Sequence, residues 1–126
     1  MMELAMAKIL VVDDSGTSRA ELMSSIQSNH MILEACDGVA GVELYKANQD
    51  IDLIITDLNM PAMDGMTMLK EIGKLSSRKP SAIVVTTETD TSLREVGKEA
   101  GVRVWIVKPF NPDSISDVVE KILSGS

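Results

Sequence analysis

Short apolar segments alternate with longer amphipathic segments along the whole chain. The apolar segments are rich in valine, isoleucine and leucine, and runs of this length and composition are typical of β-strands. The first, third and fourth are almost continuously aliphatic, as parallel strands are when helices cover both faces of a sheet. The predicted strands span residues 8–12, 31–36, 52–56, 81–86 and 103–107.

Helical periodicity marks the segments between and after these strands. It is clearest after the fifth strand, where apolar residues recur at i, i+3, i+4, i+7 and i+8 from Ile115 to Leu123 and form one stripe of a helix. The other predicted stripes are Leu22, Met23 and Ile26 in the first helix, Ala40, Leu44 and Ala47 in the second (residues 38–47), Leu69, Ile72 and Leu75 in the third, and Leu93, Val96 and Ala100 in the fourth.

The strict alternation of strand and helix predicts one α/β domain with an open parallel sheet. Helices wrap both faces of such a doubly wound sheet through right-handed crossovers. A chain of 126 residues fits a single domain of this kind. We expect residues 7–124 to form it and residues 1–6 to be a disordered N-terminal extension, with no output domain attached.

Charge and composition narrow the classes of partner. The net charge of −7 argues against nucleic acid or an anionic membrane as the main partner. No segment approaches the ~20 apolar residues that span a bilayer, and the N-terminus lacks the features of a secretory signal, so we expect a cytoplasmic protein. The single cysteine, Cys36, excludes an intrachain disulfide, and its setting at a strand end predicts a small buried side chain.

Polar residues stand where the predicted strands end. Asp13 and Asp14 follow the first strand, Asp57 follows the third, Thr86 ends the fourth and Lys108 follows the fifth. Ligands of open parallel sheets bind beyond the carboxyl ends of the strands. We therefore expect three carboxylates, a hydroxyl group and a lysine to converge at one edge of the sheet.

This set of groups suits phosphoryl transfer. Carboxylates that lie together raise each other's pKa unless a cation neutralises them, and Mg²⁺ prefers oxygen ligands of this kind. A lysine can pair with a carboxylate or a phosphoryl group, and an aspartate can itself be a nucleophile that forms an acyl phosphate. A metal ion, a lysine and a hydroxyl group around one carboxylate are the parts that stabilise charge on phosphoryl oxygens.

Each residue also has an ordinary structural interpretation. Asp14, Ser15 or Thr17 could cap the first helix, Asp57 could be a turn residue, and Lys108 could be a surface lysine. The ordinary interpretation is the better one for each residue taken singly. Their occurrence at neighbouring strand ends favours the functional interpretation.

Four motifs carry a resemblance to a known family. They are VVDDS (11–15), DLIITDLNMPAMDG (52–65), VVTTE (84–88) and WIVKPF (105–110). With these motifs, the chain resembles the receiver domain of two-component response regulators over nearly its whole length. The resemblance implies a flavodoxin-like (βα)5 domain with a five-stranded parallel sheet.

The resemblance also implies roles for individual residues. Asp57 would be the phosphoacceptor, Thr86 and Lys108 would contact the phosphoryl oxygens, and the Lys108–Pro109 peptide would be cis. The protein would be no enzyme beyond its own phosphorylation and dephosphorylation. The ligands of Mg²⁺ would be Asp13, Asp14, Asp57 and the backbone carbonyl of Asn59.

Within the family, the chain looks most like the stand-alone CheY-type chemotaxis regulators. NMPAMDG, KPFNP and Trp105 carry this likeness. It implies a histidine kinase of the chemotaxis type as phosphodonor, and a switch in which Thr86 and Trp105 reshape the face of the fourth helix, fifth strand and fifth helix. The effector would be a flagellar motor switch protein or another protein, and we expect a monomer. Trp105 could equally be a ring packed under the fourth helix, and the two interpretations are compatible.

Three further residues refine this picture. Asn59 and Glu88 stand where the family places side chains that flank the attacking water, and their types imply fast dephosphorylation. The only histidine, His30, is predicted to lie in a loop far from the acidic edge, so the phosphoryl group must come from another molecule.

Two alternatives stay open at this point. One is a phosphorelay intermediate that passes its phosphoryl group to a histidine-containing transfer protein. The other is a metal-dependent phosphatase that uses an aspartyl phosphate, although such enzymes place the nucleophile in an Asp-x-Asp arrangement after the first strand, and DDSGTS lacks it.

Overall fold

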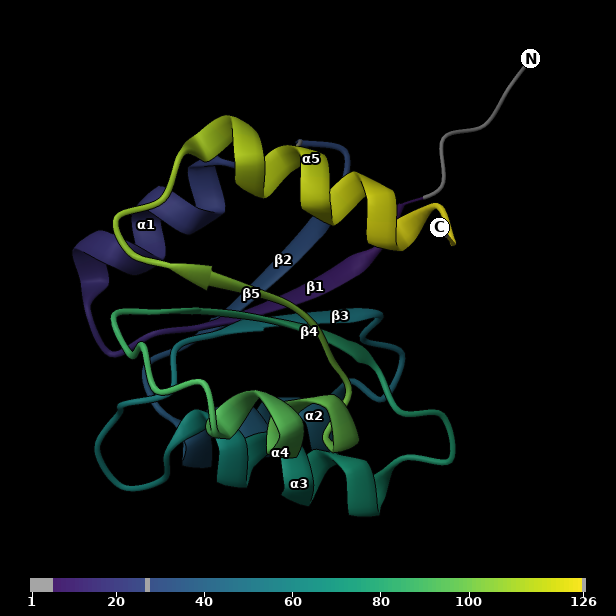
Figure 1. Cartoon of the computed structure of the whole chain (residues 1–126). Helices are drawn as coiled ribbons and strands as arrows, with labels where there is room; N and C mark the ends of the chain where they lie inside the picture. Colours follow the sequence, from purple (N-terminus) through teal and green to yellow (C-terminus); the bar gives the residue numbers. More distant parts are fainter. Residues whose placement is uncertain (1–5, 27, 126) are drawn as a thin grey trace.

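The computed structural model describes residues 6–26 and 28–125, in which strands and helices alternate (Figure 1). Of the predicted N-terminal extension, residues 1–5 lie outside the described part, and Met6 is exposed just before the first strand. The elements are β1 (Lys8–Val12), α1 (Gly16–Ser24), β2 (Met31–Ala35), α2 (Gly38–Ala47), β3 (Leu53–Thr56), α3 (Gly65–Leu75), β4 (Ser81–Thr86), α4 (Leu93–Glu99), β5 (Val102–Val107) and α5 (Pro112–Leu123).

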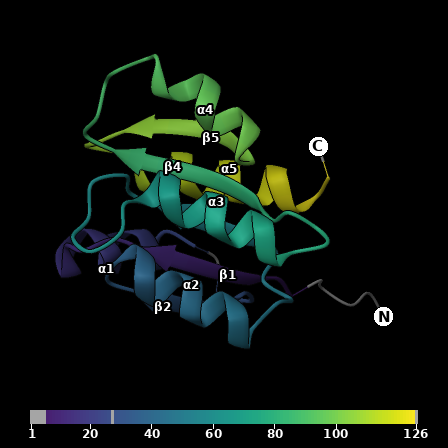
Figure 2. The same cartoon turned by 90° about the horizontal axis from the view of Figure 1, so that it is seen from below.

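The strands form one parallel sheet in the order β2-β1-β3-β4-β5. Helices α1 and α5 cover one face, and α2, α3 and α4 cover the other (Figures 1 and 2). The winding direction therefore changes between β1 and β3, and the predicted doubly wound α/β fold is confirmed. Among the helices of the described residues, none is long and apolar enough to cross a bilayer.

The strands carry apolar side chains on both faces because both faces are buried. In β1, Ile9 and Val11 pack toward α1 and α5, whereas Leu10 and Val12 pack toward α2 and α3. All four side chains have no exposed surface. This arrangement explains the almost continuous aliphatic runs that the sequence shows, and it makes the central strands a rigid support for the residues that follow them.

Side-chain caps fix the start of several helices. Ser15 accepts a hydrogen bond from the Ser18 backbone N–H and caps α1, while Asp64 caps α3 through the Thr67 N–H. Of the three residues that could have capped α1, Ser15 does so, and Asp14 is not used as a cap. This choice leaves the Asp14 carboxylate available at the edge of the sheet.

Helix α2 buries a different side from the one predicted. Ala47 is exposed and Ala40 and Leu44 are only half-buried, whereas Gly41, Val42 and Tyr45 form the buried side. The physical reason is close approach, because a Cβ atom at Gly41 would collide with Met68 of α3. A glycine adds nothing to a hydrophobic stripe, so the spacing of apolar residues could not reveal this face.

Two other burial predictions were wrong. Cys36 is exposed, because it follows β2, an edge strand where fewer neighbours cover a side chain. Leu75 is also exposed, because it is the last residue of α3 and lies beyond the part of that helix that contacts the core.

Candidate functional site

The site lies at the carboxyl end of the sheet, where β1 and β3 are neighbours. Val12 and Thr56 are paired in register, so the residues after them, Asp13 and Asp57, leave the sheet side by side. The Asp57 backbone N–H donates to the Val12 carbonyl at 3.0 Å and continues the ladder past the strand end. This is the position at which ligands bind in open α/β sheets.

Asp57 is almost enclosed by its neighbours. The residue is only 8% exposed. Its Oδ1 accepts hydrogen bonds from the backbone N–H groups of Leu58 (2.6 Å) and Asn59 (3.4 Å). Burial raises the pKa of the Asp57 carboxyl, but hydrogen bonds from Lys108 and Thr86 outweigh burial and hold that pKa below its ordinary value. Asp57 is therefore an ionised carboxylate at neutral pH.

Lys108 joins two of the predicted carboxylates. Its Nζ donates to Oδ2 of Asp57 at 2.8 Å and to Oδ2 of Asp13 at 2.9 Å. Burial lowers the pKa of the Lys108 ammonium, but the hydrogen bonds to the two aspartates outweigh burial and raise it above its ordinary value. The peptide between Lys108 and Pro109 is cis, as expected.

Asp13 and Asp14 are adjacent in sequence but lie in different surroundings. Asp13 is fully buried, with Oδ1 accepting from the Ser15 backbone N–H at 2.9 Å and Oδ2 bound to Lys108. Asp14 is exposed, and no hydrogen bond or ion pair joins its side chain to another residue of ranges 6–26 and 28–125. The exposed Asp14 carboxylate thus keeps its oxygens available to an external cation.

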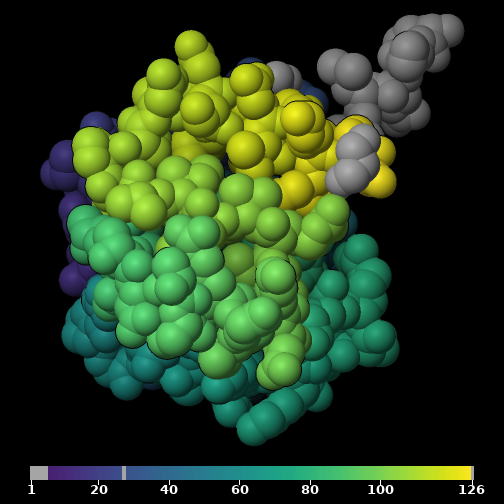
Figure 3. All heavy atoms as spheres, viewed as in Figure 1, coloured from purple at the N-terminus to yellow at the C-terminus, as the bar shows by residue number. Residues whose placement is uncertain are grey.

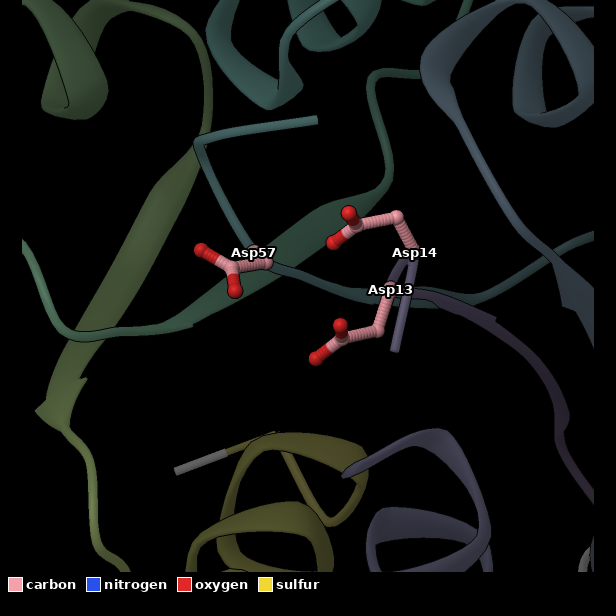
Figure 4. Close-up of side chains that lie close together, drawn as sticks. All are labelled: Asp13, Asp14 and Asp57. Carbon is pink, nitrogen blue, oxygen red and sulfur yellow. The ribbon is translucent and has the colours of Figure 1, made fainter. Parts of the chain in front are cut away.

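The carboxylates of Asp13, Asp14 and Asp57 lie close enough together to bind one metal ion. One oxygen from each of Asp13, Asp14 and Asp57 lies within 4.8 Å of the others, and Figure 4 shows the three side chains gathered at the ends of β1 and β3. An all-oxygen set of this size and charge fits a hard divalent cation such as Mg²⁺. The residues therefore fit the cation that the sequence predicted, while the part of the Asn59 carbonyl stays a prediction.

Thr86 lies on the other side of Asp57. It is fully buried at the end of β4, its Oγ1 accepts from the Glu88 backbone N–H at 3.2 Å, and its hydroxyl group lowers the pKa of Asp57. The Lys108 backbone N–H donates to the Thr86 carbonyl at 2.8 Å, which ties the ends of β4 and β5 together. Of the two residues predicted to flank a water, Asn59 is exposed and Glu88 half-buried.

Trp105 is the predicted switch residue and lies within β5, three residues before Lys108. Its ring packs on the core beneath α4, with the guanidinium carbon of Arg94 at 5.5 Å from the ring centroid. The indole N–H is buried and finds no hydrogen-bond partner in the part of the chain that the structure describes. The core interpretation is thus confirmed, and a ring that no hydrogen bond anchors also suits a movable side chain.

Sequence reasoning missed a structural role for Gly65. The Gly65 backbone N–H donates to the Leu58 carbonyl at 2.9 Å, and a Cβ atom at Gly65 would collide with the carbonyl oxygen of Asp57. The Thr56 hydroxyl donates to that same Asp57 carbonyl at 2.7 Å. The glycine in the NMPAMDG motif therefore lets α3 start directly against the backbone of Asp57.

His30 lies in a loop away from the acidic edge, as predicted, but it is not a simple loop residue. Its side chain is 3% exposed, with Nε2 at 2.7 Å from the Glu120 carboxylate of α5 and Nδ1 accepting from the Ala7 N–H. These contacts join residues far apart in the chain, so no local pattern could have revealed them. His30 is a structural residue at the end of the sheet opposite the site.

Known proteins resemble this chain in sequence and in fold. The sequence model of one protein family, the response regulator receiver domain, matches residues 9–120. A chemotaxis protein CheY homolog of Campylobacter jejuni is 35% identical over 119 residues, a match that covers 92% of either chain. Chemotaxis protein CheY1 of Helicobacter pylori is 37% identical over 119 residues, covering 92% of this chain and 96% of that protein. The solved structure of chemotaxis protein CheY4 of Vibrio cholerae aligns with a TM-score of 0.83 at 32% identity, covering 94% of this chain and 99% of that one.

Proposed function

The chain belongs to the response regulator receiver domain family, and from this premise we propose that phosphorylation of Asp57 switches a protein-binding face on its surface. It is a phospho-accepting regulator of a two-component system and a homologue of the CheY chemotaxis regulators. The observation that carries the choice of Asp57 is its position. It is the carboxylate between Lys108 and Thr86, beside the acidic pair.

The proposed transfer is a simple displacement. An oxygen of the Asp57 carboxylate attacks the phosphorus of a phosphohistidine or a small acyl phosphate, and the bond from phosphorus to the donor breaks as the donor leaves with the electron pair. Lys108, which already donates to Asp57, stays within reach of the phosphoryl oxygens. Attack of water on the acyl phosphate returns the carboxylate and releases inorganic phosphate.

Asp13, Asp14 and Asp57, with the carbonyl of Asn59, are the proposed ligands of Mg²⁺. The cation, when bound, supplies positive charge that offsets the charge on the phosphoryl oxygens. Asp14 serves as the more direct ligand because its carboxylate has no competing partner in the described part of the chain. Asp13 is held by Ser15 and Lys108 and contributes mainly negative charge.

Thr86 and Trp105 are the proposed switch. A phosphoryl group on Asp57 offers new acceptors to the Thr86 hydroxyl, which already interacts with the Asp57 carboxyl. Movement of Thr86 at the end of β4 opens space for the Trp105 side chain on the neighbouring strand β5. The change thus passes from the acidic edge to the outer strand of the sheet.

The face that responds is made by α4, β5 and α5. These elements adjoin on one side of the molecule, as Figure 3 shows, and Val107 of β5 is 40% exposed there. We expect the kinase to be a histidine kinase of the chemotaxis type and the effector to be a flagellar motor switch protein or another protein. The chain would act as a monomer in the cytoplasm, without multiple turnover of a phosphate ester substrate.

A pull-down tests this function. The unphosphorylated protein and its Mg²⁺–beryllium fluoride adduct are compared for proteins retained from a lysate of the source cells. The proposal predicts a protein retained only by the adduct and lost with Val107→Lys. An identical set of retained proteins in both states would contradict it.

The chain offers a matched control for that variant. Val39 of α2 is 45% exposed, close to the 40% of Val107, but α2 packs on β2 and β1, away from β5 at the other edge of the sheet. Val39→Lys adds the same charge at a similar exposure and is expected to keep the adduct-specific partner. Equal loss with both variants would show a general effect of charge and not a defined face.

A further inference from the structure

Arg19 of α1 contacts the backbone of the acidic loop. Its Nη1 donates to the carbonyl oxygen of Asp13 at 2.7 Å, and its Nε donates to Oε1 of Glu34 at 2.7 Å. The Arg19 side chain is 21% exposed, and Glu34 lies on the edge strand β2. One guanidinium group therefore joins a helix, a strand and the loop that carries Asp13 and Asp14.

The bond to the Asp13 carbonyl has a consequence for Asp14. That carbonyl belongs to the peptide that joins Asp13 to Asp14, so a donor that fixes it restricts rotation of the whole peptide plane. The Asp13 N–H is also held, by the Ala35 carbonyl at 3.2 Å. The Asp14 side chain has no partner of its own in the described ranges, so the restraint nearest to it is the backbone that Arg19 holds.

We infer that Arg19, oriented by Glu34, is a positioning residue that aims the Asp14 carboxylate into the divalent-cation site. The inference rests on the magnesium site proposed above. The planar guanidinium suits this role, because its donors point in fixed directions and can bind a carbonyl and a carboxylate at once. A lysine at the same place has one nitrogen and holds the two acceptors less firmly.

A positioning role and simple electrostatics predict opposite changes in Mg²⁺ affinity when Arg19 is removed. Arg19 is a cation bound to the backbone of the loop that carries Asp13 and Asp14, so by charge alone its removal should make Mg²⁺ bind more tightly. If Arg19 positions Asp14, its removal weakens Mg²⁺ binding instead. Loss of an outer partner of a metal ligand typically costs about 10–100-fold in metal affinity.

Titration calorimetry with Mg²⁺ alone tests the inference on the full chain. We expect Arg19→Gln to bind Mg²⁺ about tenfold more weakly than the wild type. Arg19→Lys keeps the charge, and its Mg²⁺ affinity is expected to lie between those of the wild type and Arg19→Gln. This variant separates the effect of geometry from that of charge, and it replaces Arg19→Gln if that variant fails to fold. Arg78→Gln is the matched control, because Arg78 pairs with Asp52 at 3.5 Å and lies before β4, at the end of the sheet opposite the site.

Labelling by acetyl phosphate gives a second readout. A positioning role predicts that Arg19→Gln needs more Mg²⁺ for half-maximal labelling but approaches the wild-type rate at saturating Mg²⁺. Unchanged or tighter Mg²⁺ binding in both Arg19 variants would overturn the inference and leave the magnesium site intact. A wild-type protein that binds no Mg²⁺ would overturn the proposed site and the inference with it.

Discussion

The Nζ of Lys108 lies 2.8 Å from Oδ2 of Asp57, across 51 positions of sequence, and the same nitrogen lies 2.9 Å from Oδ2 of Asp13. One ammonium group is therefore shared by two carboxylates that have almost no exposed surface. A cation or phosphoryl group that enters the site must share these two aspartates with Lys108. Because Lys108 holds both aspartates, we expect the free energy of unfolding to depend on whether a cation or phosphoryl group is bound there.

Replacing Lys108 with methionine should expose that link. The variant leaves Asp13 and Asp57 close together without their common cation, so we expect the free energy of unfolding without metal to fall by about 1–3 kcal/mol. Mg²⁺ should restore more stability to this variant than to the wild type, because the cation relieves a larger repulsion. Urea unfolding with and without Mg²⁺ measures both effects.

A matched lysine gives the control for this experiment. Lys46 pairs with Glu43 on the surface of α2 at 3.2 Å, and both side chains are exposed. Lys46→Met is expected to change the free energy of unfolding by less than ~0.5 kcal/mol, with or without Mg²⁺. A similar loss in the two variants would mean that the shared ammonium has no special role.

Asn59 is expected to set the lifetime of the phosphorylated form. It follows Asp57 by two positions and is exposed at the mouth of the site, where a longer side chain would hinder the approach of water. Asn59→Arg should therefore slow the decay of phosphorylated protein after the phosphodonor is removed. Phosphate release followed over time measures the rate, with Gln49→Arg, an exposed position before β3, as the control. An unchanged decay rate in Asn59→Arg would count against this assignment, and slow decay of the wild type would favour the phosphorelay alternative.

Trp105 is the only tryptophan, so its fluorescence reports on the proposed switch. The Mg²⁺–beryllium fluoride adduct should make Trp105 less accessible to acrylamide quenching, because movement of Thr86 gives the ring a more buried position. Thr86→Ala should weaken this change. Thr87→Ala, at the exposed neighbouring position, should preserve it. Equal quenching of the free protein and the adduct would show that the ring does not take part.

Two glycines of α3 should respond oppositely to alanine. A Cβ atom at Gly65 would collide with the Asp57 carbonyl, so Gly65→Ala should lower the free energy of unfolding by more than about 2 kcal/mol and impair labelling of Asp57. A Cβ atom at Gly73 has its nearest neighbour, the Lys79 side chain, at 3.5 Å. Gly73→Ala should therefore stabilise the protein by about 0.5–1 kcal/mol. Chemical denaturation distinguishes the two, and equal effects would contradict the proposed contact of Gly65.

The sequence predicts the fold well where one physical pattern dominates. The strands were found to within one residue at each end, because burial on both faces leaves a continuous aliphatic run such as residues 81–86. The meeting of Asp13, Asp57, Thr86 and Lys108 followed from the same logic, since parallel strands place their carboxyl ends at one edge. The order of the strands then brings Asp13 and Asp57 next to each other.

Features that depend on contacts between distant segments were not predictable. The buried side of α2 is set by the approach of Gly41 to Met68, and the exposure of Cys36 by the place of β2 at the sheet edge. Likewise, no local pattern marks Arg19, although it binds the Asp13 carbonyl and Glu34. A single sequence gives the type of a side chain, but not which partner lies beside it.

The central claim is that Asp57 accepts the phosphoryl group, and mapping of the modified residue tests it most directly. The wild type, Asp57→Asn and Asp13→Asn are each treated with acetyl phosphate and Mg²⁺, and the intact mass and the modified peptide are measured. We expect one phosphoryl group on Asp57 in the wild type, slower labelling of the same residue in Asp13→Asn, and no labelling in Asp57→Asn. Labelling of Asp57→Asn at the wild-type rate, or a phosphoryl group on Asp13 or Asp14 of the wild type, would contradict the claim.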